Sequence, residues 1–141
     1  MIMKKAFKNK KVLITGHTGL KGSWLSLLLS HLGANVYGVS NNFSVDKTNY
    51  KNFRMKTKIN NHNIDIRDFK KFKKIIDQIK PNYIFHFAAQ SLVGEAYKKP
   101  LYNFETNING TLNLLEILRL SKFKCIIKYW WCKNYYNQYR Y

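Results

Sequence analysis

A chain of 141 residues, 45% of them hydrophobic, is long enough for one domain with its own core and too short for two. No apolar run reaches the length of a membrane-spanning helix. The two cysteines, Cys125 and Cys132, lack the Cys/His set of a zinc site, so we expect a reduced, cytoplasmic protein with no metal. The formal net charge of +18 favours anionic partners. The lysines are scattered rather than gathered in one stripe, which favours a solvated basic surface over a nucleic-acid face.

The first predicted unit is a strand, a glycine loop and a helix. An apolar strand over 11–15 leads into a loop that contains Gly16, Gly19 and Gly22, and a helix follows over 20–32. Such a loop presents backbone N–H groups to a pyrophosphate, and the dipole at the helix N-terminus favours its negative charge. The spacing therefore predicts a dinucleotide site, with a plain strand-to-helix turn as the alternative. The apolar helix positions are Leu20, Trp24, Leu27, Leu28 and Leu32, and Gly33 ends the helix.

The next segment predicts a buried parallel strand over 34–39. In a dinucleotide fold, the end of this strand often carries an acid that binds the ribose hydroxyls. Here no carboxylate occurs before Asp46, which leaves the choice between NAD and NADP open; the positions just after the strand hold Ser40, Asn41 and Asn42. Residues 41–58 predict a polar, mobile connection.

A strand, a helix and another strand follow. We expect a strand over 59–64, then a helix whose N-cap is Asp68 and whose last residue precedes Pro81. A further strand is predicted over 82–87. The helix has its apolar face at Phe69, Phe72, Ile75, Ile76 and Ile79.

A loop then leads from Ala88 to Pro100, and a long helix is predicted over about 102–120. The loop lies at the carboxyl end of a strand, where parallel sheets bind ligands. A fifth strand begins within 123–128. The helix has apolar or small residues at helical spacing at Ile108, Thr111, Leu112, Leu115 and Leu118.

This alternation predicts an α/β fold: a Rossmann-like, doubly wound parallel sheet that stops after the fourth or fifth strand. We assign residues 1–128 to a partial NAD(P)-binding domain and residues 129–141 to an atypical aromatic and basic tail. The tail contains aromatic residues but no acid, which is a poor match to an α/β element. A frameshifted or truncated end, an interface segment, and a stacking surface for single-stranded nucleic acid remain alternatives.

Four motifs together carry a family resemblance. They are Gly16-His-Thr-Gly-Leu-Lys-Gly-Ser-Trp-Leu25, Asp65-Ile-Arg-Asp68, Pro81-Asn-Tyr-Ile-Phe-His-Phe-Ala-Ala-Gln90 and Thr106-Asn-Ile-Asn-Gly-Thr111. Over about residues 10–120 the chain resembles the extended short-chain dehydrogenase/reductases, in their NAD-dependent epimerase/dehydratase family. The resemblance implies the N-terminal cofactor-binding part of a sugar-nucleotide 4,6-dehydratase. A sugar-nucleotide 4-epimerase and a basic nucleic-acid-binding module are the alternatives.

The resemblance implies NAD as the cofactor, with NADP left open, and assigns a binding role to twelve residues. Asp65 and Ile66 would meet the adenine edge, and Asn107 would brace the backbone of the active site. Ala88, Ala89 and Gln90 would line the nicotinamide-ribose side. The pyrophosphate would be held by the loop residues Gly16, Thr18, Gly19, Leu20, Lys21 and Gly22, whose neighbour His17 either touches the cofactor or only shapes the turn.

The resemblance assigns no catalytic residue. In the family, a Tyr-x-x-x-Lys pair lies on the helix after the fifth strand, and its Tyr is the general base. Tyr129 and Lys133 have this spacing but fall where the strand should be. We interpret His86 as a core histidine and the pair Glu95 and Tyr97 as surface residues. We therefore expect the 141 residues alone to be inactive, with a nucleotide sugar as substrate in the full-length family, no membrane contact, and homo-oligomerisation left open.

Overall fold

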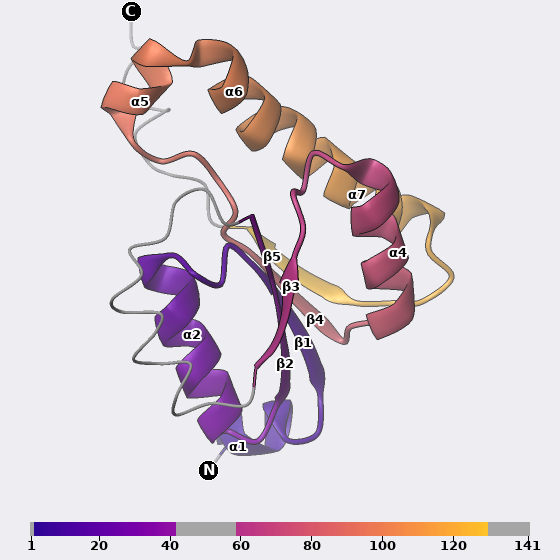
Figure 1. The fold of residues 1–141 in the computed structure, drawn as a ribbon. Helices are drawn as coiled ribbons and strands as arrows, with labels where there is room; N and C mark the ends of the chain where they lie inside the picture. The colour runs from indigo at the N-terminus through magenta and orange to yellow at the C-terminus, as the bar shows by residue number, and fades with distance from the viewer. Residues whose placement is uncertain (1, 42–58, 130–141) are drawn as a thin grey trace, which may run out of the picture.

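The computed structural model describes residues 2–41 and 59–129. Their strands form one five-stranded sheet in the order β3-β2-β1-β4-β5, and all four neighbouring pairs are parallel (Figure 1). This is the doubly wound order that the alternation of elements predicts, because the crossovers within the described residues connect parallel strands through helices. The strands are β1 (Lys11–Thr15), β2 (Asn35–Ser40), β3 (Asn60–Asn63), β4 (Tyr83–His86) and β5 (Ile126–Tyr129).

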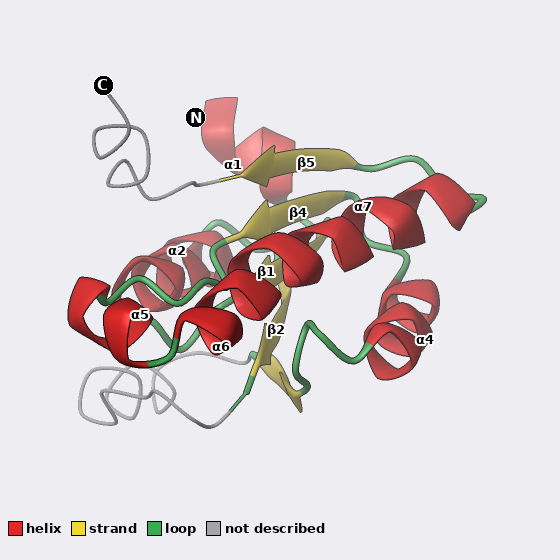
Figure 2. Cartoon of the chain, turned by 90° about the horizontal axis from the view of Figure 1, so that it is seen from above, coloured by secondary structure: helices red, strands yellow, loops and turns green. Residues whose placement is uncertain are grey.

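Helices cover both faces of the sheet. Helix α2 lies on one face, while α4 and α7 lie on the other, and α5 and α6 lie beyond the carboxyl ends of the strands (Figures 1 and 2). The helices are α1 (Ile2–Phe7), α2 (Leu20–His31), α4 (Phe69–Ile79), α5 (Val93–Lys98), α6 (Pro100–Phe104), the π-helical turn η2 (Glu105–Asn109) and α7 (Gly110–Leu120).

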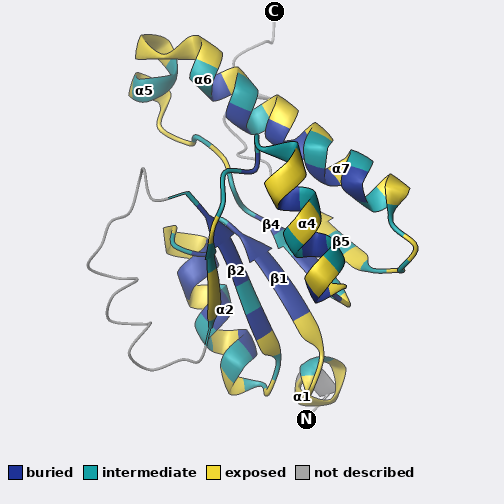
Figure 3. Ribbon diagram, turned by 45° about the vertical axis from the view of Figure 1, so that its right-hand side comes forward, coloured by how far each residue is buried: buried dark blue, intermediate teal, exposed yellow. Residues whose placement is uncertain are grey.

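The core has two parts because successive residues of a buried strand point to opposite faces. On the face of α4 and α7, Leu13 and Ile84 pack against buried residues of both helices, among them Phe72 and Leu114. On the face of α2, the strand residues Val12, Ile14 and Val36 pack against Leu29. Figure 3 shows the resulting buried sheet between partly exposed helices.

The local signals around α4 behave as predicted. The Asp68 carboxylate accepts a hydrogen bond from the Lys71 N–H at 3.1 Å, so it caps the helix. Lys80 adopts a left-handed conformation with φ of 48°, and Pro81 follows, so the helix ends where the sequence predicts.

The prediction for the segment after β4 was partly wrong. Residues 93–98 form a helix that was expected to be loop, and Pro100 begins α6 rather than ending the loop. Pro is well suited to the first helical position because its missing N–H has no acceptor there. The turn η2 then interrupts the regular hydrogen-bond pattern before α7.

The apolar face predicted for this long helix was also partly wrong, although Thr111 is buried and Leu118 packs against the core as expected. Ile108, Leu112 and Leu115 are exposed, and the buried residues of α7 are Gly110, Thr111, Leu114 and Ile117. A small residue at 110 is required because a Cβ there would lie 2.4 Å from Cδ1 of Ile66. The helix thus approaches the sheet through its small residues as well as its leucines.

Helix α2 repeats this pattern. Its predicted apolar positions Leu20, Trp24 and Leu28 are exposed, whereas its buried residues are Gly22, Ser23, Ser26 and Leu29. The buried hydroxyls cost little because each donates to a carbonyl of its own helix: Ser26 Oγ to Gly22 O at 2.7 Å and Ser23 Oγ to Leu20 O at 3.0 Å.

Two predictions lie outside the described residues: the mobile connection, except for Asn41, and the tail from residue 130 onward. Within residues 2–41 and 59–129, no helix is long and apolar enough to cross a membrane. The same part of the chain holds no group of three potential metal ligands, and its cysteine, Cys125, is not in a disulfide.

Candidate cofactor site

The glycine loop follows β1 directly and lies at the carboxyl edge of the sheet, between the ends of β2 and β4. Gly16 has φ of 71°, which favours glycine, and its N–H donates to Val39 O of β2 at 2.7 Å. A Cβ at this position would lie 2.7 Å from the Ala88 nitrogen. The first glycine therefore allows close contact with the segments that follow both neighbouring strands.

Gly22 fixes the approach of α2 to this loop. A Cβ there would lie 2.2 Å from Gly16 O and 2.7 Å from Cα of His17, both backbone atoms. Gly19 has only one contact of this kind, at 3.4 Å from Gly16 O, and serves as the N-cap of α2. The loop is thus held by backbone packing, with its middle glycine left more open.

The N-terminus of α2 suits an anion. The helix has twelve residues, and its first turn contains no acid that would neutralise the positive end of the dipole. Its first N–H groups lack partners within the helix, as at any helix start. Leu20 and Lys21 are exposed and Thr18 is half-buried, so their side chains lie outside the packed part of the loop. The donors that this structure offers a pyrophosphate are mainly backbone amides.

His17, in the middle of the loop, is fully buried. Its ring occupies the space above Gly38 of β2, where a Cβ would lie 2.3 Å from two ring atoms. It hydrogen-bonds to the Val39 backbone and the Asn61 side chain, and burial lowers the pKa of its imidazole. Of the two roles left open by the sequence, this position fits the one in which His17 shapes the turn.

The loop over residues 88–90 is held by side chains. The Gln90 N–H donates to Oδ1 of Asn107 at 2.7 Å, and Nδ2 of Asn107 donates to Gln90 O at 3.1 Å. Asn103 Oδ1 also accepts from Nδ2 of Asn107, at 2.9 Å. Asn107 lies in the π-turn η2, a feature often found at functional sites. The expected brace between Asn107 and the loop backbone is present.

Asp65 and Ile66 lie just beyond β3. The Asp65 carboxylate accepts hydrogen bonds from Arg67 and, at 3.2 Å, from Nδ2 of Asn41. Burial alone would raise the pKa of Asp65, but the bonds from Arg67 and Asn41 outweigh burial and lower it. The Ile66 side chain is buried in the core, and its carbonyl accepts from Asn113 at 3.0 Å. Only the backbone N–H of Ile66 is therefore suited to the adenine role.

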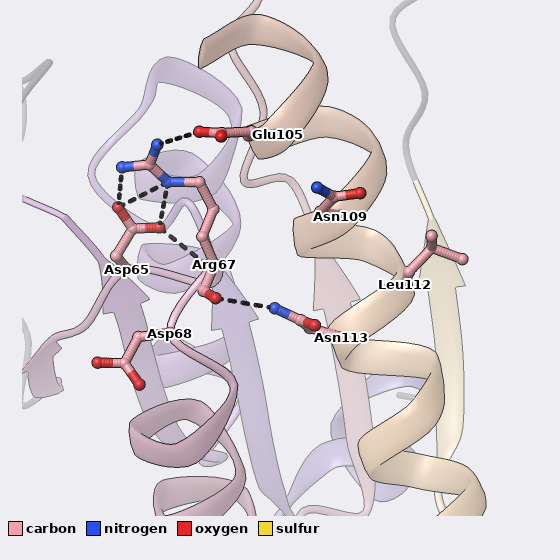
Figure 4. Close-up of a pocket in the computed structure, with 7 residues that line it drawn as sticks. All are labelled: Asp65, Arg67, Asp68, Glu105, Asn109, Leu112 and Asn113. Carbon is pink, nitrogen blue, oxygen red and sulfur yellow. Dashed lines mark hydrogen bonds and ion pairs between the residues drawn. The ribbon is translucent and has the colours of Figure 1, made fainter. Parts of the chain in front are cut away.

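A polar pocket of about 620 Å³ adjoins Asp65 on the side of η2 and α7 (Figure 4). Inside it, Arg67 pairs with Asp65 at 2.7 Å and with Glu105 at 3.1 Å, and its guanidinium lies 4.6 Å from the ring centroid of Tyr102. None of its described lining residues comes from the glycine loop, so this pocket is not the predicted crevice. The lining residues are Asp65, Arg67, Asp68, Glu105, Asn109, Leu112 and Asn113.

The structure brings the predicted residues together at one edge of the sheet. The glycine loop touches Ala88, the segment 88–90 is tied to Asn107, and Asp65 is tied to Asn41 at the end of β2. Glu95 and Tyr97 lie on α5, with Tyr97 exposed and Glu95 half-buried. At the position of the usual ribose-binding acid stand Ser40 and Asn41, with no carboxylate.

Sequence reasoning missed Thr15, the last residue of β1. Its hydroxyl is fully buried and accepts the Ala88 N–H at 3.2 Å, so it fixes the start of the second loop. The signal was available, because a polar residue ends an otherwise apolar strand just before the glycine loop. The roles of Arg67 and Asn113 had no comparable signal, since both depend on contacts across more than 35 positions of sequence.

Comparison with known proteins identifies the family. The family model for GDP-mannose 4,6 dehydratase matches residues 13–139. CDP-glucose 4,6-dehydratase of Salmonella typhimurium is 38% identical over 139 residues, which are 98% of this chain and 39% of the relative. GDP-mannose 4,6-dehydratase of Vibrio cholerae is 31% identical, over 86% of this chain and 34% of its own length.

Solved structures of related enzymes have the same fold as this chain. An epimerase of Methanothermobacter thermautotrophicus aligns with a TM-score of 0.76 and 30% identity, over 92% of this chain and 37% of its own. UDP-glucose 4-epimerase of Stenotrophomonas maltophila, solved with bound NAD, aligns with a TM-score of 0.76 and 27% identity, over 86% and 36%.

The chain spans little more than a third of the length of these relatives. The resemblance that the four motifs predicted is confirmed, and so is the Rossmann-like parallel sheet. The chain belongs to the GDP-mannose 4,6 dehydratase family, within the NAD-dependent epimerases and dehydratases.

Proposed function

We propose that this chain is the N-terminal, NAD-binding part of a sugar-nucleotide 4,6-dehydratase that acts on CDP-glucose. The observation that carries the proposal is the glycine loop, in which Gly16 and Gly22 have no room for a Cβ and the N-terminus of α2 faces the site without an acid. The relative named CDP-glucose 4,6-dehydratase, similar over 98% of this chain, supports the choice of substrate.

The residues present fit a dinucleotide. Backbone amides of the glycine loop other than those of Gly16 and Gly19, which donate within the protein, would bind the pyrophosphate, with Thr18, Leu20 and Lys21 at its rim. Asp65 and the N–H of Ile66 would meet the adenine, and Ala88, Ala89 and Gln90 would face the nicotinamide ribose, braced by Asn107. The chemistry that NAD supplies when bound is reversible acceptance of a hydride from the sugar.

The described residues supply the binding and orientation of the cofactor rather than acid–base catalysis. His86 is buried at the end of β4, where burial lowers its pKa to about 4, so it is neutral at pH 7 and poorly placed to exchange protons with a substrate. We therefore propose that the 141 residues alone bind the cofactor without turnover. The nucleotide sugar would be bound by, and react with, parts of a longer protein.

The cofactor claim is tested by titrating NAD and NADP separately into the purified chain in a calorimeter. We expect saturable binding of NAD with one site per chain. NADP is tested as well because Ser40 and Asn41 leave the ribose end without the acid that would repel a 2′-phosphate. Tighter binding of NADP than of NAD would change the proposed cofactor. Absence of binding by either nucleotide would contradict the proposal.

A 4-epimerase is the second candidate, favoured by the solved epimerases that share this fold at 27% and 30% identity. The two activities differ in their products, since a 4,6-dehydratase removes water and an epimerase does not. Mass spectrometry of the product made from CDP-glucose by a longer protein that contains these 141 residues separates them. A mass loss of one water supports the dehydratase, whereas an unchanged mass together with a new C4 epimer in the proton NMR spectrum supports the epimerase.

Location and assembly belong to the same proposal. We propose a reduced cytoplasmic setting, which agrees with the free thiol of Cys125, the cysteine that lies within the described residues. Exposed apolar side chains on α6 and α7, such as Leu101 and Leu112, offer a surface for self-association. The nucleic-acid alternative depends on the tail, which lies outside the described residues, and residues 2–41 and 59–129 provide no observation that favours it.

A further inference from the structure

Two threonine hydroxyls lie on either side of the buried His86 ring. Thr15 Oγ1, at the end of β1, lies 2.7 Å from Nδ1, and Thr111 Oγ1, on α7, lies 3.1 Å from Nε2. All three residues are at least nine-tenths buried. The contacts connect a strand, its neighbour in the sheet and the helix above them, although the three residues are far apart in sequence.

The partners of the hydroxyls fix the direction of each hydrogen bond. Thr111 Oγ1 donates to the carbonyl of Asn107 at 2.7 Å, and a carbonyl can only accept. The single proton of that hydroxyl is therefore used, so Nε2 of His86 must donate to Thr111. On the other side, Thr15 Oγ1 accepts the Ala88 N–H at 3.2 Å and lies 2.7 Å from Nδ1, so its own proton is available to Nδ1. Because burial lowers the pKa of His86 to about 4, the ring is neutral at pH 7, so its one proton lies on Nε2 and Nδ1 accepts from Thr15.

The series of hydrogen bonds through Thr15, His86 and Thr111 reaches the Ala88–Gln90 loop, which we assign to the nicotinamide ribose, at both of its ends. At one end, Thr15 holds the amide of Ala88. At the other, Thr111 holds the carbonyl of Asn107, whose side chain binds the N–H and the carbonyl of Gln90. The loop from Ala88 to Gln90 is thus tied at its first and last residues to a single ring.

We propose that His86 is a positioning residue: its imidazole, with the proton on Nε2, couples the end of β1 to the π-turn and so sets the position of the Ala88–Gln90 loop against the cofactor. The inference deepens the proposed function and rests on it for the role of that loop. His86 itself is only 4% exposed, so in this proposal it acts through the two threonines and not by direct contact with cofactor or substrate.

The first test cuts the chain of hydrogen bonds at each end. Thr15→Val and Thr111→Val keep the shape of the side chain but remove the hydroxyl, so we expect each to raise the dissociation constant of NAD about tenfold. Thr15→Ser and Thr111→Ser restore the hydroxyl and should return affinity to within about twofold. The matched control is Thr106→Val, because Thr106 is equally buried in η2 and its hydroxyl has no hydrogen-bond partner among the described residues.

A positioning role is distinguished from a merely structural one by measuring both the NAD affinity and the unfolding midpoint of each variant. If Thr111→Val lowered the unfolding midpoint but bound NAD as tightly as Thr106→Val, the positioning role would be overturned. His86→Gln keeps a donor near Nε2, and His86→Asn keeps an acceptor near Nδ1. We expect each to bind NAD more weakly than wild type, and wild-type affinity in both would also contradict the proposal.

The closing experiment is independent of the cofactor. Nitrogen-15 NMR of the histidine side chains should show His86 protonated on Nε2 alone at pH 7, and amide exchange at Gln90 should be about tenfold faster in Thr111→Val than in Thr106→Val. Protonation on Nδ1, or equal exchange in the two variants, would overturn the inference. If the wild type bound no NAD, the proposed function would fall, while these two results would still decide the role of His86.

Discussion

The two loops that flank the candidate cofactor site are held in place by different means. The glycine loop is held by steric fit, with backbone packed on backbone at Gly16 and Gly22. The Ala88–Gln90 loop is held by hydrogen bonds to Asn107 and Thr15. A steric fit cannot yield to an added carbon, whereas a hydrogen-bonded loop weakens step by step as donors and acceptors are removed.

The largest effect should follow from breaking the steric fit. Gly22→Ala places a methyl group 2.2 Å from Gly16 O, and the atoms that it meets in Gly16 and His17 are all backbone, which prevents an easy shift. We expect the free energy of unfolding to fall by about 3 kcal/mol and NAD binding to disappear. Urea denaturation and calorimetric titration measure the two effects.

Gly94→Ala is the matched control for that substitution. Gly94 also lies in a helix, α5, but a Cβ there meets nothing within 4 Å. Alanine should leave NAD binding unchanged and stabilise the chain by a few tenths of a kcal/mol, because it is the better helix former. Equal losses in both variants would show that the glycine loop has no special need for Gly22.

The hydrogen-bonded side of the site, which contains His86, predicts that the free energy of unfolding depends on pH. The pKa of His86 is about 4 in the folded chain, below its value of 6.5 in an unfolded chain. The unfolded state therefore binds more protons between these values, so the stability present above pH 6.5 is lost as the pH falls toward 4. Between pH 7 and pH 5 we expect this residue to account for a loss of about 2 kcal/mol.

Urea denaturation of wild type and His86→Asn across this pH range isolates the contribution. Burial also lowers the pKa values of His17 and His62, so the wild-type slope contains their share as well. The difference between the two proteins removes that share. If the free energy of unfolding depended on pH in the same way in both proteins, folding would leave the pKa of His86 unchanged, which contradicts the prediction.

A smaller effect is expected at the brace itself. Asn107→Ala removes both hydrogen bonds to the Gln90 backbone, in a site that is only partly buried. We expect a loss of about 1.5 kcal/mol in stability and a weaker, but still measurable, affinity for NAD. Asn109→Ala, an exposed residue of the same π-turn, is the control and should retain the wild-type affinity. If both variants bound NAD alike, the brace would have no role in the cofactor site.

The comparison also explains how far the sequence could predict the structure. The strand–helix alternation from β1 to β4, the cap at Asp68 and the end of α4 follow from short-range patterns, and the structure confirms them. The buried faces of α2 and α7 did not follow, because both helices approach the sheet through small residues such as Gly22, Ser26 and Gly110. An apolar stripe is a poor guide where close approach decides which side is buried.

In the candidate site, too, some features follow from the local sequence and others depend on the packed fold. The glycine loop was predicted from its spacing, because the tight turn at Gly16 and the close helix approach at Gly22 both require glycine. The contacts of Thr15 and Thr111 with His86 join three elements that the sequence keeps far apart. Hydrogen bonds of this kind depend on the packed sheet and helix, so they can be found only once the fold is known.

The central claim is that the amides of the glycine loop bind the pyrophosphate of NAD, and amide NMR of the nitrogen-15-labelled chain tests it most directly. On titration with NAD, we expect the largest shifts at residues 16–22, smaller shifts at residues 88–90, and none in Gly22→Ala. Shifts confined to other parts of the chain, or the same shifts in Gly22→Ala, would contradict the account.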